Sequence, residues 1–554
     1  MEASKWIAAA ASIWIQCSCG ASYAFGIYSP VLKASQGYDQ STLDTISVFK
    51  DIGANAGVLS GFLYSAVCRR RRHAPQSFFR GPWVVLAAGA VQCFVGYFFM
   101  WLAVTGAIPP PHVAAMCLFM FLAAHAQTFF STANVVTAVQ NFPQYSGTIV
   151  GIMKGFLGLS GAVLIQIYQT LFAGKPSTFL LMLALVPTLL PLVLMFFVRV
   201  HHVQSKDHDK KYLNNFSLIS ILVATYLMFL ILIDKIFVLS PWIRDLALAL
   251  LLTLLSSPIF IAVKARKQDL ETLSPTSSTS KTPLLEHPDL IKPQNLSKAT
   301  PSDTTLDVGD EQATMNDGVE RRLQTSPTSK IPMLEDPESR NQEHLSKATS
   351  SNAILEVGDE LNLIQAMKTL NFWLLFTAML CGMGSGLATI NNISQIGESL
   401  GYTPGERSTL VSLWSIWNFF GRFGAGYLSD ILMHKNGWAR PLTMTFTLAT
   451  MTAGHIIVGS GFPGNLYIGS ILVGVCYGSQ WSLMPTITCE IFGVSHMGTI
   501  FNTIAIASPL GSYIFSVRVI GYIYDKESMG SSCNGTHCFM LSFFIMAAVS
   551  LLGF

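Results

Sequence analysis

The chain has few charged residues for its length. Asp, Glu, Lys and Arg make up 12% of the 554 residues, against about 25% in soluble globular domains. Hydrophobic residues make up 51%, and the mean hydropathy is +0.46. The net charge of +3 gives no indication of a nucleic-acid partner. We therefore expect most of the chain to lie in a lipid bilayer.

Motifs of common enzymes and cofactor sites are missing as well. The sequence contains no phosphate-binding Gly-x-x-x-x-Gly-Lys loop, no His-Glu-x-x-His and no Gly-x-Ser-x-Gly. The ten cysteines do not have the spacing of zinc ligands. We expect no enzymatic activity, no catalytic residue, no cofactor and no metal. The first apolar run lacks a basic front region, so we predict no cleavable signal peptide.

What the chain does contain is a series of apolar runs that are long enough to cross a bilayer as helices. They lie near residues 6–32, 45–67, 82–104, 112–134, 147–171, 178–199, 214–234, 241–263, 369–391, 408–430, 440–460, 464–486, 497–523 and 538–554. The order is six runs, two further runs, a polar segment and six final runs. The sequence therefore predicts an all-α membrane protein with about 14 spans.

Lys and Arg gather in the loops on one side of these runs. Residues 69–72, 206–211, 264–267 and 435–440 would all face that side, and the opposite loops are short and poor in Lys and Arg. The positive-inside rule predicts that this side is the cytosol and that both termini lie there. The membrane is either the plasma membrane or an endomembrane.

The polar segment, residues 264–365, is rich in Ser, Thr, Pro and charge, so we predict a disordered cytosolic loop. It contains a tandem duplication with a period of 49 residues, in which Leu296–Thr300 recurs as Leu345–Thr349. An inert tether and a loop regulated by phosphorylation both fit this composition, and the sequence identifies no cytosolic partner. Residues 361–367 are expected to form a short amphipathic helix.

A duplication relates the two membrane parts. Ser41-Thr42-Leu43, Asp51, Asn55 and Gly57 recur about 367 residues later as Ser408-Thr409-Leu410, Asn418, Arg422 and Gly424, and each set follows a Gly-Tyr pair. Gly147-Thr148-Ile149 recurs as Gly498-Thr499-Ile500. Repeated helical bundles are typical of secondary transporters, in which the substrate binds between the repeats.

One loop carries a recognisable gate motif. Gly421 to Asp430, followed by His434 and Lys435, resembles the Gly-x-x-x-Asp…Arg-Lys motif of the major facilitator superfamily. Glycines permit close helix contact, and the acid can cap a neighbouring helix end. The matching position of the first half holds Ser65 in place of the acid.

Longer stretches resemble plant nodulin-like and nuclear-fusion-defective-type proteins of that superfamily, which are similar to oxalate/formate and monocarboxylate transporters. The matching stretches are Trp14–Tyr28, Val48–Asn55, Gly147–Gly161, Gly382–Gly401, Asn418–Asp430 and Pro509–Asp525. The resemblance implies a major facilitator fold with two six-helix bundles and alternating access. The nodulin-like domain would span 1–263, with a bundle at 1–199 and two extra helices at 214–263. The second bundle would span 366–554.

Ionisable and polar side chains inside the runs are candidate site residues, because a charge in the membrane is costly. We predict substrate binding by Arg422, Arg518, Asn418 and Lys154, and proton transfer or gating by Asp51, Asn55, Lys50, His125 and Asp430. Tyr23, Tyr28, Asn391, Gln480 and Trp481 lie on helices expected to face a cavity. Helix packing for Arg422, snorkelling for Arg518 and Lys154, and a structural hydrogen bond for His125 are the alternatives.

Cys533 and Cys538 bracket the glycosylation sequon Asn534-Gly535-Thr536. A disulfide and a glycan at Asn534 would both suit a non-cytosolic loop. Two free thiols and an unused sequon are the alternative.

These features together predict a secondary active transporter. It would move a small solute, an organic anion, across the bilayer, driven by the solute's own gradient or by protons. One alternative is a non-transporting membrane receptor or scaffold that uses the long loop. Another is a carrier of a cation, a metal complex or a neutral solute.

Overall fold

The computed structural model describes residues 4–68, 81–172, 176–201, 208–237, 240–273, 360–528 and 533–554. All regular elements in these ranges are helices, which confirms the predicted fold class. The ranges belong to one compact unit, drawn from residues 1–273 and 355–554. The basic residues 69–72 and the 49-residue duplication lie outside the described residues.

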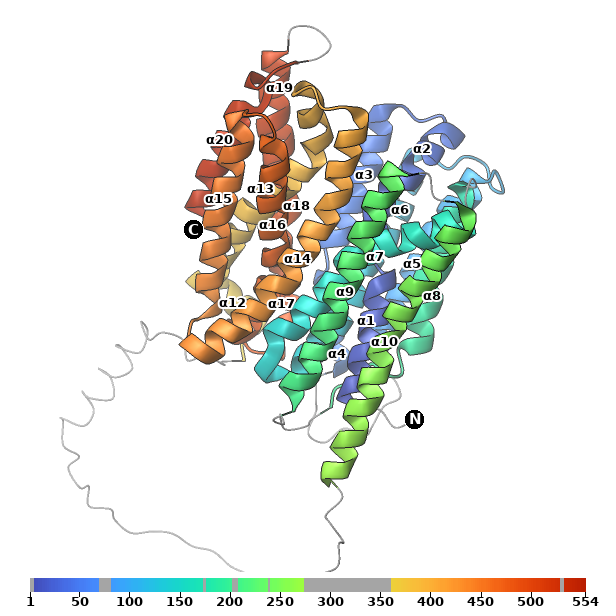
Figure 1. Cartoon of the computed structure of the whole chain (residues 1–554), viewed down its shortest axis with the longest axis vertical. Helices are drawn as coiled ribbons and strands as arrows, with labels where there is room; N and C mark the ends of the chain where they lie inside the picture. The colour runs from blue at the N-terminus through green and yellow to red at the C-terminus, as the bar shows by residue number, and fades with distance from the viewer. Residues whose placement is uncertain are drawn as a thin grey trace, which may run out of the picture. The chain divides into compact units, whose positions relative to one another are not determined.

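The first half of the unit contains ten helical elements and a further pair. They are α1 (Lys5–Ser18), η1 (Ala21–Ala24), α2 (Phe25–Gln36), α3 (Gln40–Asn55), α4 (Val58–Cys68), α5 (Pro82–Val104), α6 (Val113–Asn141), η2 (Pro143–Tyr145), α7 (Ser146–Leu171) and α8 (Pro176–Leu194), followed by α9 (Asp209–Ile236) and α10 (Pro241–Leu273). Figure 1 shows α9 and α10 as long helices, and both pack on α7.

The second half begins with a short helix. Its elements are α12 (Leu363–Met367), α13 (Leu370–Ser399), α14 (Pro404–Asn436), α15 (Arg440–Ser460), α16 (Asn465–Phe492), α17 (Met497–Ala505), α18 (Ala507–Ser512), the π-helical η4 (Tyr513–Gly521), α19 (Tyr522–Glu527) and α20 (His537–Leu552). Each of the fourteen predicted runs coincides with helix. Among the described residues, nine helical segments are long and apolar enough to cross a membrane, so the count of fourteen spans stays a prediction.

Three predicted helices are interrupted. The first breaks around Gly20, where a Cβ atom would lie 1.8 Å from the hydroxyl of Ser160 on α7. The second breaks between Asn55 and Val58, and the thirteenth is divided into α17, α18, η4 and α19. Such breaks are tolerated at membrane depth where neighbouring helices satisfy the freed backbone groups.

The repeated Gly-Tyr pair marks the same turn in both halves. Gly37 and Gly401 have positive φ angles of 65° and 80°. The backbone nitrogen that follows donates back into the preceding helix, from Tyr38 to Lys33 at 3.0 Å and from Tyr402 to Gly397 at 2.8 Å. Glycine adopts this left-handed conformation without strain, so the pair ends a helix. The duplication therefore encodes a helix–turn–helix corner.

Capping side chains start the next helix at each corner. The carboxylate of Asp39 caps α3, and hydrogen bonds from Thr42 hold the pKa of Asp39 below its ordinary value. Thr403 caps α14, where hydrogen bonds from Thr403 lower the pKa of Glu406. Both caps satisfy backbone N–H groups that a helix start leaves free.

The extra pair is attached through polar contacts at the end of the unit where α1 begins, which we call the lower end (Figure 1). Lys5 and Asp209 form a buried ion pair at 2.7 Å, and Asp269 accepts a 2.9 Å hydrogen bond from the indole of Trp6. These contacts hold α10 helical to Leu273, beyond the predicted end at 263. Its polar composition resembles a loop, but α1 and α9 supply partners for it. The end that contains the α2–α3 turn is the upper end.

Candidate functional site

A cavity of about 470 Å³ lies between the two halves of the unit. Both halves contribute to its lining through Ser22, Tyr23, Phe25, Gly26, Lys50, Asp51, Ala54, Asn55, Gln127, Thr128, Ser131, Lys154, Leu157, Gly158, Leu387, Ile390, Asn391, Val411, Trp414, Ser415, Asn418, Arg422, Tyr477, Trp481, Phe501, Asn502 and Ala505. A second hollow, lined by Ser35, Gln36 and residues 103–110, has no ionisable side chain in its lining. The cavity between the halves is therefore the candidate site.

Below the cavity, Asp430 joins α14 to the start of α7. Its carboxylate accepts hydrogen bonds from the backbone nitrogens of Gly147 at 3.0 Å and Thr148 at 2.6 Å, and from the Thr148 hydroxyl at 2.6 Å. Arg440 pairs with the same carboxylate and with Glu490. An acid suits this place because a helix N-terminus attracts negative charge. The base that partners the predicted gate residue is thus Arg440, whereas His434 bonds the Asp430 carbonyl at 2.6 Å.

The repeat-related contact closes the other side of the lower end. Ser65, at the end of α4, lies 3.3 Å from the Thr499 hydroxyl at the start of α17. The helices touch directly here, since a Cβ atom on Gly61 would lie 2.5 Å from the Cα atom of Thr499. The same holds between α7 and α14, where a Cβ atom on Gly426 would lie 2.3 Å from the carbonyl oxygen of Gly147. Both repeats therefore close the seam at the lower end.

Exposure of the lining rises toward the upper end. The side chain of Asp51 is 31% exposed and Val411 is 43% exposed, whereas Lys154 is 3% and Arg422 is 1% exposed. The two contacts described above join the halves at the lower end, below the buried side of the cavity. The cationic residues lie at its deep side.

Arg422 links both halves at the deep side of the cavity. Its Nε donates to Asn418 at 2.8 Å, Nη1 to the carbonyl of Lys154 at 3.0 Å, and Nη2 to the hydroxyl of Tyr23 at 3.1 Å. The rings of Tyr23 and Trp481 lie 5.8 Å and 5.7 Å from the guanidinium carbon. A guanidinium has five N–H groups, so one on each terminal nitrogen has no partner among the described residues.

Lys154 lies beside this guanidinium. Its ammonium donates to the hydroxyl of Ser131 at 2.8 Å and faces the rings of Trp481 and Phe501 at 5.2 Å and 5.3 Å. The ammonium points into the seam between the halves, which differs from the snorkelling alternative. Within the described residues, no carboxylate lies within 4 Å of the charged nitrogens of Lys154 or Arg422.

The repeat-related positions in the first half also line the cavity. Lys50 and Asp51 pair with each other at 3.2 Å, and Lys50 lies over the ring of Phe25 at 4.9 Å. Asn55 donates to the backbone oxygen of Asp51 at 2.8 Å. The charges of Lys50 and Asp51 therefore cancel, whereas the guanidinium of Arg422 at the deep side has no carboxylate partner among the described residues.

His125 does not line the cavity. Its Nε2 lies 3.0 Å from the carbonyl of Ala56, at the break between α3 and α4, and its Nδ1 lies 2.8 Å from the side chain of Gln92. The imidazole thus satisfies a backbone group that the break frees, as in the structural alternative. Tyr28 and Gln480 are also buried outside the cavity and contact the sulfurs of Met120 and Met451.

Arg518 lies outside the cavity, unlike the other residues predicted to bind substrate. It is exposed, its guanidinium lies 5.9 Å from the ring of Tyr513, and it is absent from the cavity lining. The structure therefore does not pair Arg518 with Arg422. The reason is local geometry, because a π-helix turns less per residue than the α-helix that the sequence pattern assumes, so side chains in η4 face other directions.

Several lining residues were not singled out from the sequence. Ser131, Trp414, Tyr477, Phe501 and Asn502 all face the cavity. Aromatic and small polar residues are frequent in membrane helices, so composition and spacing do not distinguish them from packing residues.

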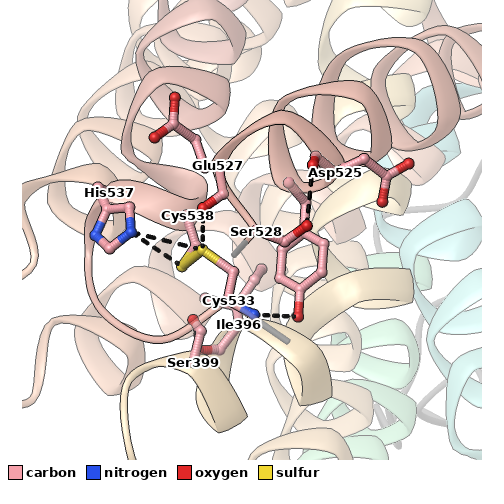
Figure 2. Close-up of a disulfide and its surroundings, with 9 residues drawn as sticks. Ile396, Ser399, Asp525, Glu527, Ser528, Cys533, His537 and Cys538 are labelled. Carbon is pink, nitrogen blue, oxygen red and sulfur yellow. Dashed lines mark hydrogen bonds between the residues drawn. A yellow bond between two sulfur atoms is a disulfide. The ribbon is translucent and has the colours of Figure 1, made fainter. Parts of the chain in front are cut away.

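The sequon lies near the upper end of α13, away from the cavity. Figure 2 shows the disulfide between Cys533 and Cys538 with His537 beside it. The backbone nitrogen of Gly535 donates to Ser399 at 2.8 Å, and Asn534 is exposed. The His537 Nε2 atom lies within 4.0 Å of both sulfurs. This group does not form a metal site, because disulfide sulfurs are not thiolates.

Comparison with known families assigns both halves. The Nodulin-like family model matches residues 5–263, and the model for the NFD4 C-terminal domain matches residues 352–554. Residues 5–263 thus resemble the nodulin-like family, and residues 352–554 resemble the C-terminal domain of NFD4. The chain is 25% identical to Protein NUCLEAR FUSION DEFECTIVE 4 of Arabidopsis thaliana, over 99% of this chain and 87% of that protein.

Two further proteins also resemble the chain. Probable transporter MCH1 of Yarrowia lipolytica is 28% identical over 150 residues, which cover 25% of this chain and 30% of that protein. The solved structure of the proton:xylose symporter XylE superposes with a TM-score of 0.52 at 12% identity, covering 99% of this chain and 94% of that chain. The similarity to XylE is a similarity of fold alone.

Proposed function

We propose that this protein is a secondary transporter that moves a small organic anion by alternating access. The cavity between the repeats is the substrate site, and the two contacts at the lower end form the gate that opens when the halves rock. The fold that it shares with the proton:xylose symporter, and the name of the fungal relative as a probable transporter, support transport in general.

The observation that supports an anionic substrate is the uncompensated positive charge of Arg422, with Lys154 beside it. Both side chains are buried, and neither has a carboxylate partner within the described residues. Buried charges are normally paired, so a substrate carboxylate is the fitting counter-ion. The remaining N–H groups of Arg422 can bind it as a fork, while Asn418 and Tyr23 fix the guanidinium plane.

Uptake into proteoliposomes tests this function. The purified protein is assayed with labelled formate, lactate and oxalate, with amino acids and with metal ions, each with and without a pH gradient. We expect uptake of at least one carboxylate. The variant Arg422→Gln should reduce it on the order of 100-fold or more, because it removes the charge-assisted bonds from a buried site.

Arg518→Gln is the matched control, since it removes an exposed arginine outside the cavity. Its uptake should equal that of the unmodified protein. Full uptake by folded Arg422→Gln protein would refute the site, and uptake confined to cations or neutral solutes would refute the anion.

A further inference from the structure

The ammonium of Lys154 lacks the partners that a buried ammonium needs. It has three N–H groups, and Ser131 accepts one of them. The rings of Trp481 and Phe501 cover two of its sides. The other N–H groups have no acceptor among the described residues, and the residue is 3% exposed.

The charged and titratable groups around Lys154 offer it no counter-ion. From the elements packed on α7, the cavity lining includes Arg422 of α14, Tyr477 of α16 and Tyr23 of η1, and from α3 it includes Lys50 and Asp51. Helices α1, α9 and α10 contribute no residue to the lining. The nearest charge, Arg422, bonds the carbonyl of Lys154 itself and has the same sign. The one carboxylate in the lining, Asp51, is already paired with Lys50.

We propose that Lys154 is the proton-binding site of this transporter, and that the carboxylate of the substrate is the counter-ion of its ammonium. This inference rests on the proposed anion transport. One proton binds the free amine of Lys154 as one monoanion binds the cavity. Both leave on the other side, so the loaded carrier moves one proton and one negative charge together.

The coupling follows from the electrostatics of the site. Without the anion, the ammonium lies out of water beside a guanidinium, and with the anion it gains an ion pair. The proton therefore binds more tightly when the anion is present, and by thermodynamic reciprocity the anion binds more tightly when the proton is present. Arg422 stays charged throughout and supplies the constant part of the attraction.

Asp51 is the competing proton site, and its environment argues against it. Its side chain is 31% exposed, and Lys50 balances its charge at 3.2 Å whether or not substrate is bound. Arrival of an anion changes the surroundings of Lys154 far more than those of Asp51. The buried amine thus has the larger difference between empty and loaded states.

Calorimetry on the purified full-length protein in detergent decides between the two sites. Formate, lactate and oxalate are the probes, each titrated in two buffers of different ionisation enthalpy from neutral to mildly alkaline pH, which gives the number of protons taken up per anion. We expect about one proton per anion in the unmodified protein and in Asp51→Asn. Lys154→Arg keeps a permanent charge and should bind without proton uptake, with an affinity independent of pH.

Lys154→Gln provides a second, uncharged variant, which should bind more weakly at every pH and also without proton uptake. Anion binding without proton uptake by the unmodified protein would overturn the inference and leave the proposed function intact. Loss of proton uptake in Asp51→Asn would also overturn it. If none of the three probes binds or enters proteoliposomes, the proposed function is refuted, and the inference, which depends on it, is refuted as well.

Discussion

Asp430 and Thr148 connect the two halves of the protein at a helix start: one carboxylate oxygen of Asp430 lies 2.6 Å from both the backbone nitrogen and the hydroxyl of Thr148. The repeat-related residues, Ser65 and Thr499, meet through their hydroxyls at 3.3 Å. The same junction is therefore ionic on one side of the pseudo-symmetric seam and neutral on the other. The two closures should differ in strength.

Replacing Asp430 should loosen the stronger closure. Asp430→Asn keeps the size of the side chain but removes its charge from the α7 N-terminus and from Arg440. We expect the closed lower end to lose about 2–5 kcal/mol, as for other buried hydrogen-bonded charge pairs. Hydrogen exchange followed by mass spectrometry should show faster exchange of the Gly147 and Thr148 amides. Ser65→Ala is the matched change and should cost about 1 kcal/mol or less. Unchanged exchange at residues 147–148 in Asp430→Asn would contradict the gate.

The hydroxyl of Tyr23 should matter for substrate affinity. Tyr23→Phe removes the acceptor of Arg422 Nη2, so the guanidinium is held less firmly. A hydrogen bond to a charged group contributes about 1.5–3 kcal/mol, so the KM for a transported carboxylate should rise about tenfold or more. Tyr28→Phe is the control, because that hydroxyl contacts Met120 outside the cavity. Equal KM values in the two variants would show that Tyr23 has no orienting role.

The buried pair of Lys5 and Asp209 should be sensitive to the loss of one partner. Asp209→Asn leaves the Lys5 ammonium, 2% exposed, without its counter-ion. The expected destabilisation is about 3–5 kcal/mol, measured as a lower midpoint of thermal unfolding in detergent. The double variant Lys5→Met with Asp209→Leu should recover most of that loss, because neither charge remains buried. A double variant as unstable as Asp209→Asn would show that the ion pair itself attaches α9.

Low pH should weaken the helix caps that follow the two Gly-Tyr turns, which contain Asp39 at α3 and Glu406 at α14. The folded-state pKa values of Asp39 and Glu406 lie below their ordinary values because Thr42 and Thr403 donate hydrogen bonds to the carboxylates. Their contribution to stability is complete above the ordinary pKa values and is lost as the pH falls through the lowered ones. Asp39→Ala with Glu406→Ala should therefore flatten the acid limb of the plot of unfolding midpoint against pH. An acid limb that keeps its slope would exclude the caps as its source.

Asn534 reports which side of the membrane the upper end faces. It is exposed in the loop closed by Cys533 and Cys538, and the positive-inside rule predicts that this loop lies away from the cytosol. Expression in eukaryotic cells should give a glycosidase-sensitive gel band that Asn534→Gln removes. Thr536→Ala should have the same effect because it also destroys the sequon. A band that glycosidase does not shift would remove this support for the predicted orientation.

The sequence alone determined the helices and their duplication. A chain in lipid must satisfy its backbone hydrogen bonds within each segment, so hydropathy locates helices directly. The Gly-Tyr pairs were detectable as part of the repeat, and the positive φ angles of Gly37 and Gly401 give the reason for them, a turn that ends a helix. The role of Asp430 could be predicted for a similar reason, because an acidic side chain stabilises the N-terminus of a neighbouring helix by a short-range electrostatic interaction.

Only the tertiary structure decided which charges meet. Besides Asn418 on its own helix, Arg422 donates to Tyr23 and to the carbonyl of Lys154, which lie far from it in sequence and in the other half of the protein. Arg518, which the pattern placed in the same site, is turned away by the π-helical segment. Periodicity fixes the face of a regular helix, but the packing of one bundle on another and a local change of helical pitch depend on contacts between distant residues, and no single segment encodes them.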